Sequence, residues 1–85
     1  MMKVTRQVCM ASMRLGRNGT FIEGKKYWCR HSRFGTSILM LSEEKQWIRV
    51  MDSKMTTGIQ PISYFTFTDM FFVKDKKELN ELIQN

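Results

Sequence analysis

The sequence predicts a mainly β domain: a small antiparallel barrel of five or six strands, followed by one short C-terminal helix. Apolar and polar residues alternate in several short segments, which is typical of half-buried strands. These segments recur at roughly ten-residue spacing with turn residues between them, as they do in small barrels. Only about the last ten residues change to a helical spacing. A β-rich α+β sheet is the alternative architecture.

The first expected strand covers residues 2–11. Apolar side chains occupy its even-numbered positions, and a period of two is typical of a strand with one buried face. Arg6 interrupts this apolar face. Residues 14–20 hold two glycines, an Asn-Gly pair and two arginines, a composition that predicts a basic loop. In the first expected strand, residues 2–11, the apolar face consists of Met2, Val4, Val8 and Met10.

The next expected strand covers residues 26–31 and follows a turn that Gly24 permits. Three further strands are expected from alternation or from β-branched and apolar composition. Residues 68–71 are expected to form one helical turn before Phe72 and Val73 rejoin the sheet. The three further strands are residues 36–41, 46–51 and 62–68.

The chain is expected to end in a short helix over residues 75–84. Asp75 precedes Glu78 by three positions, which is an acidic version of the capping box. A helix of about two and a half turns must dock to persist. We therefore expect it to pack on the barrel formed by residues 2–73, within a single domain of residues 1–85. Its apolar face consists of Leu79, Leu82 and Ile83.

Length and composition indicate one globular domain with a thin core. The first twenty residues hold four cationic side chains and no long apolar run, so no secretory leader is expected. No segment approaches the ~20 apolar residues of a membrane span, so no membrane partner is expected. Cys9 and Cys29 are too few for a disulfide scaffold. We therefore expect a cytoplasmic protein with both thiols reduced.

Charge is the most informative bulk property, because the net charge of +6 is unevenly distributed. Residues 1–34 hold eight cations and one acid, a net of +7, whereas residues 35–85 hold six cations and seven acids, a net of −1. A basic half favours an anionic partner, either a protein with an acidic surface or a nucleic acid. Solubility alone is the alternative explanation. The cations Lys74, Lys76 and Lys77 are balanced by nearby acids, so we expect them to contribute little to binding.

Cations interleaved with aromatic residues indicate where a partner would bind. Arg14 and Arg17 lie in the expected basic loop, and further cations follow on the next turn and strand. Sheets that bind single-stranded nucleic acids combine such cations with aromatic rings on which bases stack. Alternatively, Trp28 and Trp47 are core or edge residues covered by the stems of neighbouring cations. The expected binding residues are Arg14, Arg17, Lys25, Lys26, Trp28, Arg30 and Arg33.

No pattern of catalytic or metal-binding residues is found, so no enzymatic activity, cofactor, metal or small-molecule substrate is expected. Cys29 and His31 share a strand face, but no third group is evident to orient them as a nucleophilic pair. Glu43 and Glu44 are adjacent in an expected turn, where both should be solvated. A partial P-loop pattern begins at Gly19, but it has Lys where Ser or Thr must bind magnesium.

The segment Phe-Ile-Glu-Gly-Lys-Lys-Tyr at residues 21–27 resembles a pattern that recurs in small phage-encoded accessory proteins. In that pattern an aromatic residue, two residues, Gly-Lys and one residue precede a Tyr that opens a strand, and an aromatic-rich segment, like residues 64–73, closes the chain. The resemblance covers residues 2–73 and implies an SH3-like barrel. The basic loop, the apolar strand at residues 36–41 and the C-terminal helix depart from it. It implies a phage accessory factor that binds and modulates a host protein in the host cell cytoplasm, without catalytic residues; a nucleic-acid-binding small barrel is the alternative.

Overall fold

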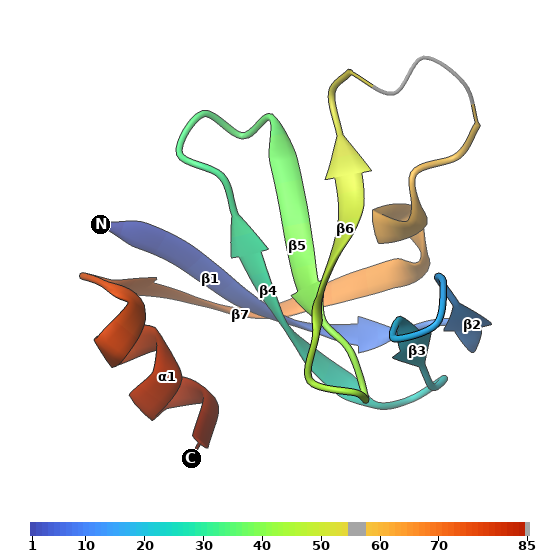
Figure 1. The fold of residues 1–85 in the computed structure, drawn as a ribbon, viewed down its shortest axis with the longest axis horizontal. Coiled ribbons are helices and arrows are strands. Elements are labelled where there is room, and N and C mark those ends of the chain that lie inside the picture. Colours follow the sequence, from blue (N-terminus) through green and yellow to red (C-terminus); the bar gives the residue numbers. More distant parts are fainter. Residues whose placement is uncertain (55–57, 85) are drawn as a thin grey trace.

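The computed structural model describes residues 1–54 and 58–84, which form a five-stranded antiparallel sheet, a two-stranded hairpin and a C-terminal helix (Figure 1). The sheet order is β6-β5-β4-β1-β7, so the first strand lies inside the sheet and the last strand at an edge. The separate hairpin pairs β2 with β3. The elements are β1 (Met2–Cys9), β2 (Met13–Arg14), β3 (Thr20–Phe21), β4 (Lys26–His31), β5 (Ser37–Leu41), β6 (Trp47–Asp52), the 3-10 helix η1 (Pro61–Tyr64), β7 (Phe65–Val73) and α1 (Lys76–Gln84).

The prediction of a mainly β fold with a short C-terminal helix is confirmed, but the barrel is not closed. β6 and β7 form the two edges of the sheet, and no strand pairing joins them in the described part of the chain. Short elements complete the cover of the core instead. Ile62 of η1, Met13 of β2 and Leu15 of the hairpin loop all pack against the buried core residues.

β1 is buried on both of its faces, which differs from the single apolar face expected from the sequence. Val4 is buried on the face that α1 covers, the outer face, whereas Thr5, Gln7 and Cys9 are buried on the inner face. Gln7 Nε2 donates to Thr5 Oγ1 at 3.1 Å, so these buried polar side chains are satisfied. Met10, expected on the apolar face, is 56% exposed because it lies beyond the end of the strand.

The inner face carries the main core. The ring of Phe21 meets the rings of Tyr27 and Phe65 edge-on, with centroids 4.9 and 5.3 Å apart. This arrangement is favourable because the positive edge of one ring meets the negative face of the other. Buried aliphatic and sulfur-containing side chains fill the rest of the core: Cys9, Cys29, Ile38, Met40 and Val50.

Both cysteines are buried free thiols. Cys29 pairs with Thr5 in the β1–β4 register, and Cys9 lies four positions further along β1. At ~3.3 Å per residue this offset is about 13 Å, well beyond the ~7 Å Cα separation that a disulfide tolerates. The two thiols therefore cannot bridge in this fold.

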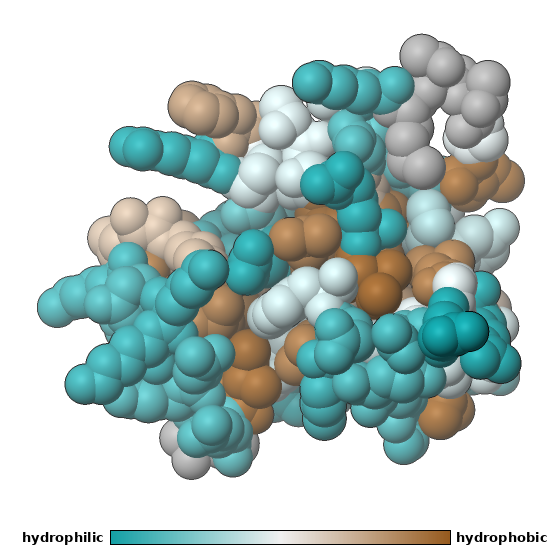
Figure 2. Space-filling model, viewed as in Figure 1, coloured by the Kyte–Doolittle hydropathy of each residue, from teal (hydrophilic) through white to brown (hydrophobic). Residues whose placement is uncertain are grey.

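α1 packs on the outer face, as its apolar spacing predicted. Leu79 is buried with Val4 and Val73, and Leu82 and Ile83 pack against them. The expected cap is present, because Asp75 Oδ1 accepts from the Glu78 backbone N–H at 2.9 Å. Figure 2 shows hydrophilic residues over α1 and the turns, with apolar residues between them in the middle of the view.

Residues 62–71 differ from the sequence prediction. Ile62 to Tyr64, expected in a strand, belong to η1, and the expected helical turn at residues 68–71 lies inside the continuous strand β7. The register between β1 and β7 shifts between Arg6 and Gln7, which leaves Thr68 as the extra residue of a β-bulge. This bulge breaks the alternation and produces a three-residue apolar spacing that resembles a helix.

Candidate anion-binding site

A basin lined by cationic side chains, here called the basic basin, lies where β1 begins. β1 runs antiparallel to β4 and β7, so its first residues lie beside the ends of both strands. This pairing brings together Lys3 of β1, Arg30 of β4 and Lys74, which follows β7, and the β4–β5 turn adds Arg33. The basin has a volume of about 910 Å³. Its apolar lining includes Met2, Leu39 and Phe72.

The basic basin has a strong charge asymmetry. Four Lys or Arg residues and no acidic residue line it, and the guanidinium of one of the four, Arg30, lies over the Trp47 ring. In residues 1–54 and 58–84, the ion pairs are Lys25–Glu43 and Arg49–Asp52, both at 3.4 Å, and neither involves a basin cation. Like charges held together produce a positive potential that attracts anions and speeds their encounter. The basin is therefore suited to binding an anionic group.

His31 lies in the basin beside Cys29, but this pair is not an activated nucleophile. His31 Nε2 is 3.0 Å from Thr5 Oγ1 and 3.7 Å from Cys29 Sγ. Burial and the charge of Lys3 lower the pKa of His31, so the imidazole is neutral at pH 7. Burial raises the pKa of Cys29 to about 11. The thiol therefore stays protonated at neutral pH, and a thiolate is the form that attacks.

The lowered pKa of His31, the single histidine, predicts acid sensitivity. Because the unfolded chain binds this proton more readily, stability should be fully present above pH ~6.5 and fall as the pH decreases toward the folded-state pKa. Urea unfolding at pH 7.5 and 5.5 measures this difference. The variant His31→Gln should lose most of the pH dependence, and an equal dependence in that variant would assign it to another group.

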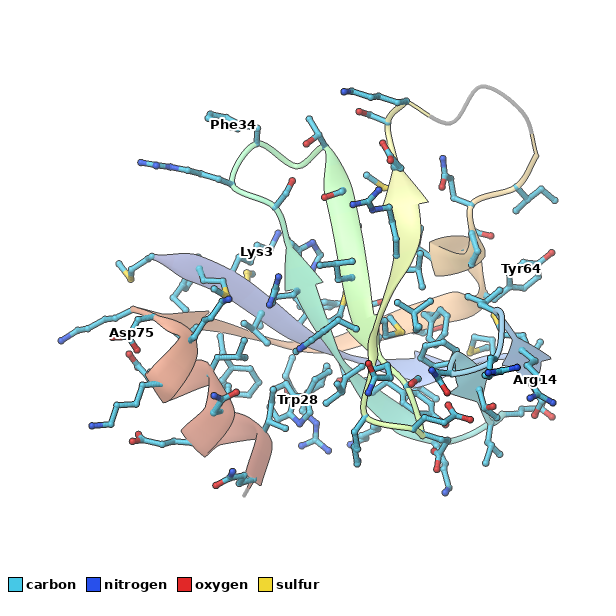
Figure 3. All side chains as sticks on the ribbon, in the orientation of Figure 1. Lys3, Arg14, Trp28, Phe34, Tyr64 and Asp75 are labelled. Carbon is cyan, nitrogen blue, oxygen red and sulfur yellow. The ribbon has the colours of Figure 1, made fainter. Side chains whose placement is uncertain are left out.

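The predicted basic loop lies well apart from the basin: Figure 3 shows Arg14 at one end of the molecule and the lining residue Lys3 toward the other. Arg14 and Arg17 are exposed in the β2–β3 hairpin. Glu43 and Glu44, from the β5–β6 turn, pack against the same end. Glu44 accepts from the backbone N–H of Thr20 at 3.0 Å, and the Glu44 carboxylate also accepts from the Thr20 hydroxyl.

These two carboxylates reduce the positive charge of the hairpin end. Glu43 accepts from the Tyr27 hydroxyl at 2.6 Å and pairs with Lys25, and these contacts hold the pKa of its carboxyl below the usual range. Hydrogen bonds from Thr20 lower the pKa of Glu44 to about 2. Glu44 is exposed, as expected, and Glu43 is half-buried, but each glutamate also has a specific hydrogen-bond partner. Of the predicted site residues, Lys25 is paired at this end, while Arg30 and Arg33 line the basin.

Lys26, Trp28 and Arg30 share one strand face, as predicted, because they pair with alternate residues of β1. Both tryptophans on this outer face are partly covered. The guanidinium of Arg6 lies 5.1 Å from the centre of the Trp28 ring, and that of Arg30 lies 5.0 Å from Trp47. Such cation–π contacts contribute about 0.5–1 kcal/mol at exposed sites. The α1 residues Leu82 and Ile83 belong to the same cluster, so the outer face is not an open stacking platform.

Sequence reasoning missed Lys3, Lys74 and Phe72. The acids that follow Lys74 in the chain predict a small contribution from it, yet Lys74 lines the basin, and its backbone N–H donates to Glu78 Oε2 at 2.8 Å. No local signal identifies these residues. Only the pairing of the first strand with the last brings them together, and this pairing is a long-range property of the fold.

Comparisons with protein-family models, with curated proteins and with solved structures find no match to this chain. The resemblance to small phage accessory proteins therefore stays a prediction. In residues 1–54 and 58–84, no three His, Cys, Asp or Glu side chains are grouped so that they could hold a metal ion. In the same part of the chain, no helix has the length and apolar character that a membrane crossing requires.

Proposed function

We propose that this chain is a small non-enzymatic binding protein whose basic basin holds an acidic surface of another protein. The basin carries the proposal, because it combines four cations with no acid. The resemblance to phage accessory proteins favours a host protein as the partner and the host cytoplasm as the place of action. Binding would then modulate that host protein.

Two observations favour a protein partner over a nucleic acid. The tryptophans that could stack with bases are covered by Arg6, Arg30 and α1. The basin also contains apolar groups, among them Leu39 and Phe72, beside its cations. Protein interfaces commonly combine an apolar centre with a charged rim.

A nucleic acid is the second candidate, and exposed aromatic residues near the basin support it. Phe72 lines the basin and is 61% exposed. Phe34, at the tip of the β4–β5 turn between two lining residues, is 84% exposed and points away from the body of the protein (Figure 3). Bases stack on exposed rings of this kind while cations contact the phosphates.

Salt dependence should separate these candidates. We expect short DNA and RNA oligonucleotides to lose their binding between about 50 and 200 mM salt, as non-specific phosphate contacts do. Immobilised protein should still retain a specific protein from nuclease-treated bacterial lysate at the higher salt concentration. A column carrying a variant with reversed basin charges is the control. Saturable oligonucleotide binding at about 200 mM salt, with no protein retained, would favour the nucleic-acid function instead.

A further inference from the structure

β7 carries a row of exposed apolar side chains, here called the β7 strip. Phe67, Met70 and Phe72 are 53, 47 and 61% exposed. They pair with Gln7, Thr5 and Lys3 of β1, so all three lie on the inner face of the sheet. Phe67 and Met70 are three positions apart and would point to opposite faces of a regular strand. The bulge at Thr68 places them on the same face.

The β7 strip lies along an edge of the sheet that no other strand occupies. β7 pairs with β1 alone in the described part of the chain, so the backbone groups along its other edge, away from β1, have no strand partner. Natural edge strands are commonly protected by charged residues, Pro or bulges; β7 contains no Lys or Pro, its single charge is Asp69, and its bulge at Thr68 interrupts the pairing with β1. The opposite edge, β6, carries an ion pair between Arg49 and Asp52. An edge that no strand occupies, beside an apolar strip, is the geometry that accepts an added strand.

We propose that an extended segment of the acidic partner adds to β7 as a sixth strand of the sheet. This inference rests on the proposed function and specifies how the partner binds. Lys3 pairs with Phe72 on the face of the strip, and Phe72 also lines the basic basin, so the two surfaces are continuous. The segment that fits them has apolar side chains at alternate positions and acidic residues at the end that reaches Lys3 and Lys74.

A second copy of this chain fits the edge less well than such a segment. Each copy carries a net charge of +6, so two copies repel each other. Asp69 is the middle residue of the nine in β7. Symmetric antiparallel pairing of two β7 strands would therefore place Asp69 opposite its own counterpart, and like charges directly opposite are unfavourable.

Two synthetic peptides test the proposal by fluorescence anisotropy. The first alternates Val and Thr over six residues and ends in Glu-Glu-Asp, and the second consists of Glu residues alone. The wild-type protein should bind the first at least ten-fold more tightly than the second. The double variant Phe67→Asp with Met70→Asp should lose this difference but still bind the second peptide. The matched control is Thr66→Asp with Ile59→Asp, which adds the same two charges away from the β7 strip. Thr66 pairs with Val8 on the outer face, and Ile59, which lies before η1, is 73% exposed.

Hydrogen exchange on the wild-type protein gives a test that needs no variant. Binding of the first peptide should slow exchange of β7 backbone amides that the free protein leaves unpaired. Unchanged β7 exchange, or equal affinity for both peptides, would overturn the added strand while leaving the basin function intact. Failure of both peptides to bind would count against the proposed function as well. Light scattering that shows a wild-type dimer, converted to monomer by the β7 double variant, would assign the edge to a second copy.

Discussion

Reversing three basin cations together should weaken binding of the acidic partner about 100-fold or more and leave the protein folded. The variant combines Lys3→Glu, Arg33→Glu and Lys74→Glu, and all three side chains are exposed. Placing like charges against an acidic surface costs several kcal/mol. Exposed substitutions usually change stability by no more than about 0.5 kcal/mol each. Titration with the partner retained from lysate, or with an acidic peptide, measures the loss.

The hairpin end of the molecule provides a control of equal charge. The variant combining Arg14→Glu, Arg17→Glu and Lys26→Glu removes the same six charges, so both variants have a formal net charge of zero. We expect this control to retain most of the affinity, because Glu43 and Glu44 already lie at that end. Equal losses in both variants would show that net charge alone determines binding. A larger loss in the hairpin variant would place the site on the basic loop that the sequence indicated.

The substitution Leu79→Ala should destabilise the protein by about 2–5 kcal/mol, the range for truncating a buried leucine. Leu79 of α1 is 2% exposed and packs against Val4 and Val73 of the sheet. In a domain of this size the melting temperature should fall by about 10 °C or more. Trp28 and Trp47 pack against the same cluster, so their fluorescence should report the loss of helix docking. Thermal unfolding followed by both circular dichroism and fluorescence measures the effect.

A substitution on the solvent side of the same helix separates docking from helix formation. Glu81 is exposed on α1, so Glu81→Ala should change the free energy of unfolding by no more than about 0.5 kcal/mol. An unchanged melting temperature for Leu79→Ala would mean that α1 contributes little to the core. The helix would then be available as a binding segment.

Sequence reasoning succeeded where local patterns determine structure. The alternation of residues 26–31 predicted β4 and its two faces, because the side chains of one face are buried in the core and those of the other are more exposed. The spacing of Leu79, Leu82 and Ile83, with the cap at Asp75, predicted α1. In both segments the local preference and the tertiary packing agree.

Prediction failed where tertiary structure overrides the local pattern. The bulge at Thr68 changes which positions of β7 share a face, and the sequence around it reads as a helical turn. The basic basin could be predicted only in part: Arg30 and Arg33 are expected binding residues that line it, but Lys3 and Lys74 join them only through strand pairing across the whole chain. Cations that are close in sequence, such as Lys25 and Arg30, lie at different ends of β4.

The position of β1 between β4 and β7 also determines the order in which the sheet can assemble. Gln7 pairs with Tyr27, 20 residues away, and with Phe67, 60 residues away. Closing the longer loop costs about 1 kcal/mol more in chain entropy. We therefore expect β1 and β4 to β6 to associate first and β7 with α1 to join late in folding. Contacts that form after the transition state change the unfolding rate rather than the folding rate, so the cluster around Leu79 should set the lifetime of the folded protein.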